Sequence, residues 1–307
     1  MRRFVRWDSQ PLDGWTERYA EGNIVFLDGH QTHYVAMGAG EPVILIHGFF
    51  FDSLLWCGNI TALAKSYRVY AIDLWGFGYS ARATPQLSYD LYSQQIHAFM
   101  KEMGIEKATL VGQSLGGGVA IQFSVKFPEM VKKLVLVDSA GLENPEPFAA
   151  RLFRMPGVGE LLMNFPVNAV RKKMLKDFFL HKPGTIPADL FERLTWFQKI
   201  EGTTFNALAL MRLGFADKLK GSLQRLAEFN LPIMVVWGAQ DNAIHVALGR
   251  QIHHELPGSL FFIIQNAGHV PNLEQPEMFN SIVETFLREG LDAAPIMPSL
   301  INGPVNG

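Results

Sequence analysis

The segment Gly112-Gln113-Ser114-Leu115-Gly116 has the residue types and spacing of a nucleophile turn. It follows the apolar run 108–111 and precedes a helical pattern over 115–127. A serine at such a strand-to-helix turn needs small neighbours, because a Cβ on either glycine would clash there. The turn also lifts the hydroxyl to the carboxyl edge of the sheet, at a helix N-terminus. We therefore predict that Ser114 is a nucleophile rather than only a helix cap.

A serine hydroxyl is a poor nucleophile unless a base stands beside it. Of the nine histidines, His269 follows the last strand-like apolar run and sits in a loop. A loop at the carboxyl end of that strand can reach Ser114 across the sheet. His253 and His254 fall within a helical pattern, where exposure to solvent is the simpler expectation. His269 is therefore predicted to be the general base.

The base in turn needs a carboxylate that fixes its tautomer and stabilises the imidazolium. Asp241 follows the apolar run 233–237, and Asp138 follows the run 133–137. Both lie on loops at the carboxyl ends of predicted strands, so either could approach His269. The sequence favours Asp241, and Asp138 remains the competing candidate.

Acyl chemistry also needs backbone N–H groups that stabilise a developing oxyanion. One is expected from Leu115, the residue after the nucleophile. The other is expected from Phe49, in the loop that follows the apolar run 43–46. Gly48 allows this loop to turn tightly, and we expect His47 to brace it by hydrogen bonds rather than to transfer protons.

These residues depend on a regular alternation of strands and helices. Asp28-Gly29 separates two strand-like runs and predicts a β-hairpin, and short buried runs then alternate with helical patterns. This alternation predicts a mostly parallel sheet in an α/β fold. The predicted strands are 24–27, 32–37, 43–46, 68–72, 108–111, 133–137, 233–237 and 260–264, and the later helices are 246–256 and 277–288.

The alternation stops between residues 141 and 219, where helical patches replace strands. These patches cover 149–153, 167–180 and 190–200 and are separated by prolines. The sequence therefore predicts a helical cap inserted into a sheet-based core, with a groove between them as the default ligand site. The expected division is a core of 1–140 and 220–290, a cap of 141–219 and a flexible tail of 291–307.

The composition excludes several other classes of protein. The chain has 307 residues, a formal net charge of −2 and 48% hydrophobic residues, so neither disorder nor a global basic field for nucleic acid is expected. The only cysteine, Cys57, cannot form an internal disulfide, and no run approaches the length of a membrane span. A cytoplasmic location is the expectation. There is no Walker A, H-E-x-x-H or paired-cysteine zinc pattern, and Gly38-Ala39-Gly40 precedes a strand instead of a helix.

Five blocks in order resemble the α/β-hydrolase superfamily, across roughly residues 24 to 290. They are 46–49, 73–80, the turn around Ser114, 237–241 and 268–269. The chain order Ser114, Asp241, His269 is the one this superfamily uses. The resemblance implies an eight-stranded, mostly parallel sheet with a helical cap after the sixth strand. It also implies that neither a metal nor an organic cofactor is needed.

The identities of single residues indicate which enzymes of the superfamily this chain resembles most. Ser114 argues against haloalkane dehalogenases and epoxide hydrolases, which carry Asp at this turn. Meta-cleavage-product hydrolases, which break C–C bonds, use Ser and have glycines like 116–118, but they usually place Trp after the histidine, where this chain has Val270. Arg193 matches an arginine of those enzymes only weakly. Cofactor-free haloperoxidase-like enzymes share the Ser114 triad and often hydrolyse esters.

The leading expectation is a serine carboxylesterase, similar also to lipases, that acts on small-molecule esters of short-to-medium acyl chains. The alternatives are a C–C bond hydrolase, a lipase with an interfacial lid and a non-catalytic ligand-binding protein. Phe50, Phe148, Phe153 and Val270 are expected to line the substrate pocket. The cap is rich in apolar residues and also carries basic residues such as Lys176. Packing and pocket lining are favoured over contact with a lipid surface, and the oligomeric state is not predicted.

Overall fold

The computed structural model describes residues 5–82, 87–144, 148–165, 176–182, 184–214 and 218–296, without the side chains of 148–150 and 294–296. Its centre is an eight-stranded sheet of order β1-β2-β4-β3-β5-β6-β7-β8. Only the pairings of β2 with β1 and with β4 are antiparallel. The predicted mostly parallel sheet is therefore confirmed. Its strands are β1 (Asn23–Leu27), β2 (His30–Met37), β3 (Pro42–Ile46), β4 (Arg68–Ile72), β5 (Ala108–Gln113), β6 (Val131–Val137), β7 (Ile233–Gly238) and β8 (Leu260–Ile264).

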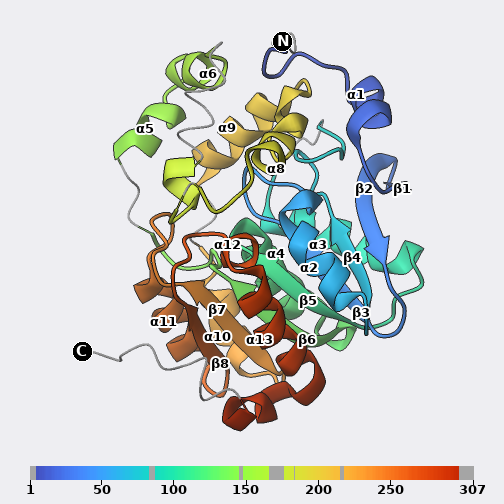
Figure 1. Ribbon diagram of the computed structural model, residues 1–307, viewed down its shortest axis with the longest axis vertical. Coiled ribbons are helices and arrows are strands. Elements are labelled where there is room, and N and C mark those ends of the chain that lie inside the picture. The colour runs from blue at the N-terminus through green and yellow to red at the C-terminus, as the bar shows by residue number, and fades with distance from the viewer. Residues whose placement is uncertain are drawn as a thin grey trace.

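Helices cover both faces of this sheet (Figure 1). Within β3, Ile44 and Ile46 belong to one core cluster, whereas Val43 and Leu45 belong to the other. Both faces of the strand are therefore buried, which explains the continuous apolar runs in the sequence. The first core packs under α3 (Tyr89–Glu102), α4 (Leu115–Lys126), α10 (Lys220–Ala227) and α11 (Val246–Glu255), and the second under α2 (Cys57–Leu63) and α13 (Pro276–Glu289).

The helical insertion after the sixth strand is also confirmed, and it lies above the carboxyl ends of the strands in Figure 1. The predicted helix 190–200 is instead two elements, α8 (Ala188–Arg193) and η3 (Trp196–Lys199), because the chain turns between them at 194–195. Most of the predicted helix 167–180 lies outside the described residues, and of its described part, 176–180, residues 176–179 are helical. The insertion contains α5 (Phe148–Arg154), α6 (Val158–Met163), α8 (Ala188–Arg193), η3 (Trp196–Lys199) and α9 (Thr203–Leu213).

The two ends of the chain add contacts that the sequence did not reveal. The helix α1 (Leu12–Tyr19) joins the cap, since Trp15 Nε1 donates to the Trp196 carbonyl oxygen at 3.0 Å. Ser9 N–H likewise donates to the Lys199 carbonyl oxygen at 2.7 Å. At the other end, η4 (Gly290–Ile296) packs on α13. Residues 297–307 lie outside the described part.

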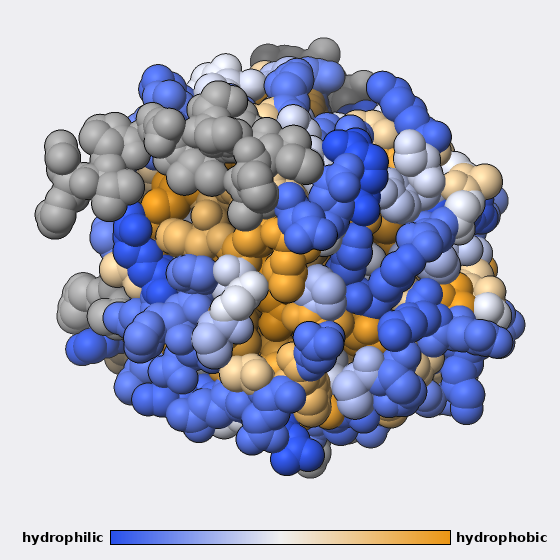
Figure 2. Space-filling model, turned by 90° about the horizontal axis from the view of Figure 1, so that it is seen from below, coloured by the Kyte–Doolittle hydropathy of each residue, from blue (hydrophilic) through white to orange (hydrophobic). Residues whose placement is uncertain are grey.

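The end of the molecule opposite the cap is mostly polar at its surface, with a band of apolar side chains near its centre (Figure 2). Among the described residues, no helix is both long enough and apolar enough to cross a membrane.

Asp73, directly after β4, ties several elements together. Its carboxylate accepts from His33 Nδ1 on β2 at 2.8 Å, and from the N–H groups of Ser53 and Tyr79 at 2.7 Å each. Burial opposes ionisation, but His33 and these hydrogen bonds lower the pKa of Asp73 to about 2. Burial likewise works against the charge of His33, yet Asp73 raises the pKa of His33 above its usual value. The pair is therefore a buried ionic contact between the β2 edge and the loop after β4.

Asp73→Asn should lower the free energy of unfolding by about 3–5 kcal/mol, because it leaves a buried His33 without its counter-charge. The carboxyl titrates near 3.8 when unfolded and near 2 when folded, so its stabilisation is present above that range and is lost as the pH falls through it. Urea unfolding at about pH 5.5, where His33 is also protonated, measures the loss.

The control for this prediction is Asp90→Asn, which removes an exposed 2.8 Å ion pair with Lys126. An exposed pair contributes about 1 kcal/mol or less. Equal losses in the two variants would contradict the role given to Asp73.

Candidate active site

Ser114 occupies the turn between β5 and α4 in a strained backbone conformation, with φ 52° and ψ −116°. This region is rarely adopted by residues other than glycine. The turn fits because its neighbours lack side chains. A Cβ on Gly112 would overlap the Gly116 carbonyl oxygen, and a Cβ on Gly116 would overlap the Ile46 carbonyl oxygen. The glycines around Ser114 therefore serve close backbone packing, as the sequence pattern indicates.

Asp241 and His269 meet on loops at the carboxyl ends of β7 and β8. His269 Nδ1 donates to Asp241 Oδ2 at 2.8 Å. The other carboxylate oxygen of Asp241 accepts from the N–H groups of Ala243 at 2.7 Å and Ile244 at 3.0 Å. Both side chains are 2% exposed, and Ser114 is 9% exposed. This arrangement fixes the imidazole tautomer and leaves its Nε2 able to accept a proton.

The loop that carries His269 is tied to the nucleophile turn and to the cap. Gln113, beside Ser114, donates from Nε2 to the His269 carbonyl oxygen at 2.7 Å. The His269 N–H donates to the Phe179 carbonyl oxygen at 2.9 Å, and the two rings stack at 5.5 Å. In the described part of the chain no hydrogen bond joins the Ser114 hydroxyl to His269. Such contacts often form only when substrate is bound.

Glu274, on α12 (Pro271–Glu274), joins the same loop to the cap segment. Its carboxylate accepts from the N–H groups of Gly268 at 2.6 Å and His181 at 2.8 Å. Burial raises the pKa of Glu274. The sequence analysis missed Gln113, Phe179 and Glu274. Gln113 lies within the motif and could have been found there, whereas the other two contacts join segments about 90 residues apart.

The two N–H groups expected to stabilise an oxyanion flank the nucleophile. A Cβ on Gly48 would lie 2.9 Å from Ser114 Cβ, so the loop that holds Phe49 runs directly beside Ser114. Neither the Phe49 N–H nor the Leu115 N–H donates to another group of the described chain. Both remain able to bind an oxyanion.

His47 braces that loop, as expected from the sequence. Its Nδ1 donates to the Gly48 carbonyl oxygen at 2.8 Å, and its Nε2 accepts from the Leu74 N–H at 2.9 Å. Burial lowers the pKa of His47, so the ring is neutral. Both of its nitrogens are occupied, and it has no free atom for proton transfer.

The four residues expected to line the substrate pocket have different positions. Phe50 contacts Phe49, with ring centroids 4.0 Å apart, and both pack with Phe153 against the cap. Phe50 also borders an apolar cavity of about 10 Å³ that includes Phe179. Val270 is fully buried in the core and does not line this cavity. The side chain of Phe148 lies outside the described part of the chain.

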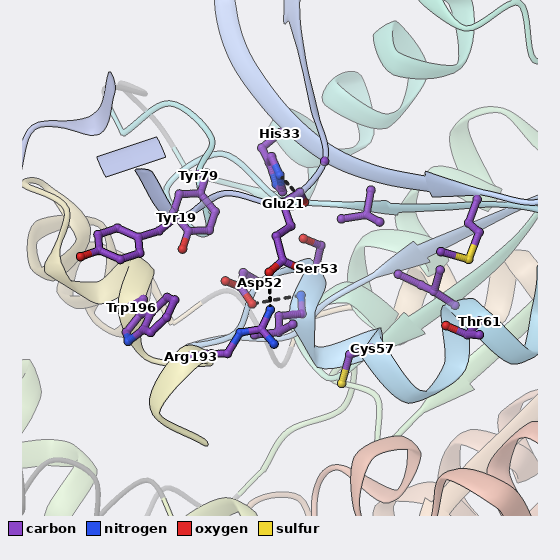
Figure 3. A pocket seen from close by; sticks show the side chains of 15 residues that line it. Tyr19, Glu21, His33, Asp52, Ser53, Cys57, Thr61, Tyr79, Arg193 and Trp196 are labelled. Carbon is purple, nitrogen blue, oxygen red and sulfur yellow. Dashed lines mark hydrogen bonds and ion pairs between the residues drawn. The ribbon is translucent and has the colours of Figure 1, made fainter. Parts of the chain in front are cut away.

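A larger cavity of about 250 Å³ lies elsewhere, between β2, α2 and the cap (Figure 3). None of the triad residues lines it. Arg193 lines it and binds Glu21 at 2.8 Å, so the weak match of Arg193 to a catalytic arginine has no support from its position. Asp52 also lines it, and burial together with Asp73 raises the pKa of Asp52 well above its usual range.

Asp138, the competing acid, lies beside the triad without contacting the imidazole through a hydrogen bond. It is fully buried, and its Oδ1 accepts from the Gly238 N–H at 2.9 Å. Burial and the charge of Asp241 raise the pKa of Asp138 well above its usual range. His269 Nδ1 donates its hydrogen bond to Asp241 instead.

The strain at Ser114 predicts a difference in stability between two variants that both remove the hydroxyl. Ser114→Gly should be more stable than Ser114→Ala by about 1 kcal/mol, because glycine adopts the positive φ without strain and alanine does not. Urea unfolding of the two variants measures the difference. Equal stability, or a more stable alanine variant, would show that the turn stores no such strain.

Comparisons with known proteins identify the family of this chain. The alpha/beta hydrolase fold family model matches residues 41–276. A 2-hydroxymuconate semialdehyde hydrolase from Pseudomonas sp. CF600 is 29% identical over 90% of this chain and 96% of that protein. Lipase 3 from Moraxella sp. TA144 is 29% identical over 76% of this chain and 73% of that protein. A meta-cleavage product hydrolase structure from Pseudomonas fluorescens IP01 is 25% identical, covers 87% of this chain and 98% of that chain, and has a TM-score of 0.74. The chain belongs to the alpha/beta hydrolase fold family.

Proposed function

We propose that this protein hydrolyses carboxylic esters through an acyl-enzyme intermediate on Ser114. The observation that carries the proposal is the buried 2.8 Å hydrogen bond from His269 to Asp241, beside a serine in a nucleophile turn. A nucleophile, a base with a fixed tautomer and two free N–H donors are the groups that acyl transfer needs.

Each group has a defined role in the reaction. His269 Nε2 takes the proton of the Ser114 hydroxyl as the oxygen attacks the ester carbonyl carbon. The N–H groups of Phe49 and Leu115 stabilise the oxyanion that forms. His269 then gives its proton to the leaving alcohol, and a water molecule activated by the same nitrogen releases the acid. Asp241 stabilises the imidazolium during both steps.

The apolar side chains between the Phe50 loop and the cap favour small acyl groups. The apolar cavity bordered by Phe50 and Phe179 has a volume of about 10 Å³, which is room for about one water molecule. An acyl chain that binds in this cavity must therefore displace side chains of the cap. Each methylene that finds room gains about 0.8 kcal/mol, so the optimum depends on how far the cap can move.

Cleavage of a C–C bond is the second candidate. The observation that favours it is the match to a 2-hydroxymuconate semialdehyde hydrolase over 96% of that protein's length. Val270, which follows the base and is fully buried, stands where such enzymes usually have Trp. A vinylogous 1,5-diketone offered beside p-nitrophenyl esters distinguishes the two reactions, and faster turnover of the diketone would replace ester hydrolysis as the proposed function.

Ser114→Ala should lower ester turnover by at least about 10³-fold, because no other group can form the acyl-enzyme. Labelling with a fluorophosphonate probe should be lost in parallel, while the unfolding midpoint stays close to that of the wild type. The matched control is Ser139→Ala, a buried serine whose hydroxyl bonds the Ala140 carbonyl oxygen at 2.8 Å. If wild-type protein takes no label although it is folded, the ligand-binding alternative applies.

A series of p-nitrophenyl esters should show an optimum at short-to-medium acyl length. Going from acetate to hexanoate can raise kcat/KM by at most about a hundredfold, since four methylenes contribute about 3 kcal/mol. Soluble monoesters should be hydrolysed faster than emulsified long-chain triglycerides. Several cap side chains, such as Leu161 at 69% and Phe205 at 71%, are exposed, so strong activation at an oil–water interface would support the lipase alternative instead.

A further inference from the structure

The carboxyl group of Asp138 has a hydrogen bond on one side only. Its Oδ1 accepts from the Gly238 N–H at 2.9 Å. Its Oδ2 is fully buried and has no hydrogen-bond partner in the described part of the chain. A buried carboxylate oxygen without a donor costs a large desolvation penalty if the group is ionised. A proton on Asp138 removes the charge and converts one of its oxygens into a donor.

Asp241 has the opposite surroundings. Its two oxygens accept three hydrogen bonds, from His269 Nδ1 and from the N–H groups of Ala243 and Ile244. These donors stabilise a negative charge. One polar side-chain atom from each of Asp138, Asp241 and His269 lies within 4.8 Å of the others. The other charged group that acts on Asp138 is Glu274 on α12, and its charge also opposes ionisation.

We propose that Asp138 is a positioning residue that stays protonated and donates its proton in a hydrogen bond to Asp241, so that the two carboxyl groups carry one negative charge beside His269. This inference rests on the triad proposed above. The added hydrogen bond holds Asp241 in place, and the imidazolium formed in each step then faces one negative charge. The raised pKa of Asp138, caused by burial and by Asp241, agrees with this state.

The same arrangement makes Asp138 a reserve acid. When Asp241 is replaced by a neutral residue, Asp138 loses the like charge that opposes its ionisation. It then supplies a carboxylate within 4.8 Å of His269. The two positions are therefore expected to be strongly non-additive in a double-mutant cycle.

Activity measurements test the protonation state. Asp138→Ala removes the donor and should lower kcat by about tenfold, and Asp138→Asn should restore most of the loss because its amide also donates. Asp138→Asn should leave the acidic limb of the kcat/KM profile within about 0.3 pH units of wild type, since a neutral group replaces a neutral group. If Asp138 is ionised, removing its charge will instead move that limb to lower pH by about one unit, which overturns the proposal.

The double-mutant cycle tests the reserve role. Asp241→Asn should lower kcat by orders of magnitude, because the imidazole loses its charged partner. Adding Asp138→Asn to that variant should cost about a further tenfold or more, against about threefold in the wild-type background. Equal factors in the two backgrounds would contradict the coupling.

Protein stability tests the shared proton without any substrate. A carboxyl that is protonated when folded and ionised when unfolded makes the free energy of unfolding fall as the pH rises above about 4. This fall should be steeper in the wild type than in Asp138→Asn by the amount of one bound proton. Parallel curves for wild type and Asp138→Asn would overturn the inference, whether or not the protein hydrolyses esters. If the curves differ but no hydrolysis is found, the proposed function fails and the shared proton stands.

Discussion

The positive φ of Ser114 is the constraint on which the rest of the site depends. A side chain in this conformation is strained, and the turn persists only because strand β3, strand β5 and helix α4 pack against it without intervening Cβ atoms. The same close packing brings the Gly48 loop beside Ser114, and within the described residues the Phe49 and Leu115 N–H groups have no hydrogen-bond acceptor. The strained serine and the two proposed oxyanion donors are thus two results of one backbone arrangement.

His269, the proposed base, is positioned by the cap as well as by the core. Its N–H bonds the Phe179 carbonyl oxygen, its ring stacks on Phe179, and Glu274 links its loop to His181. Movement of the cap segment therefore changes contacts made by His269 itself. Phe179 also lines the apolar cavity that Phe50 borders, so a substrate bound there would contact the side chain that stacks on His269.

Buried carboxyl groups in this fold have two distinct states, set by their donors. Asp73 accepts three hydrogen bonds, one from a charged histidine, and its pKa falls. Asp138 and Asp52 each lie close to another carboxylate, and burial together with that charge raises their pKa values. Neighbouring acids thus differ in charge because Asp73 and Asp241 each accept three hydrogen bonds, whereas Asp52 and Asp138 each accept one. The negative charge beside His269 is concentrated on Asp241 for this reason.

The sequence by itself determined the sheet, the helical insertion and the residues at the strand ends, because apolar period and turn chemistry are local properties. It identified Ser114, Asp241 and His269 as candidates, and a strand's carboxyl end is a position that sequence can indicate. It could not decide how Asp138 relates to Asp241, because both follow parallel strands and only the packing of β6 against β7 sets which carboxylate reaches the imidazole. The partners of the His269 loop, the burial of Val270 and the contact of α1 with the cap were also decided by tertiary structure. These contacts join segments far apart in the chain, and no local pattern records which distant groups will pack together.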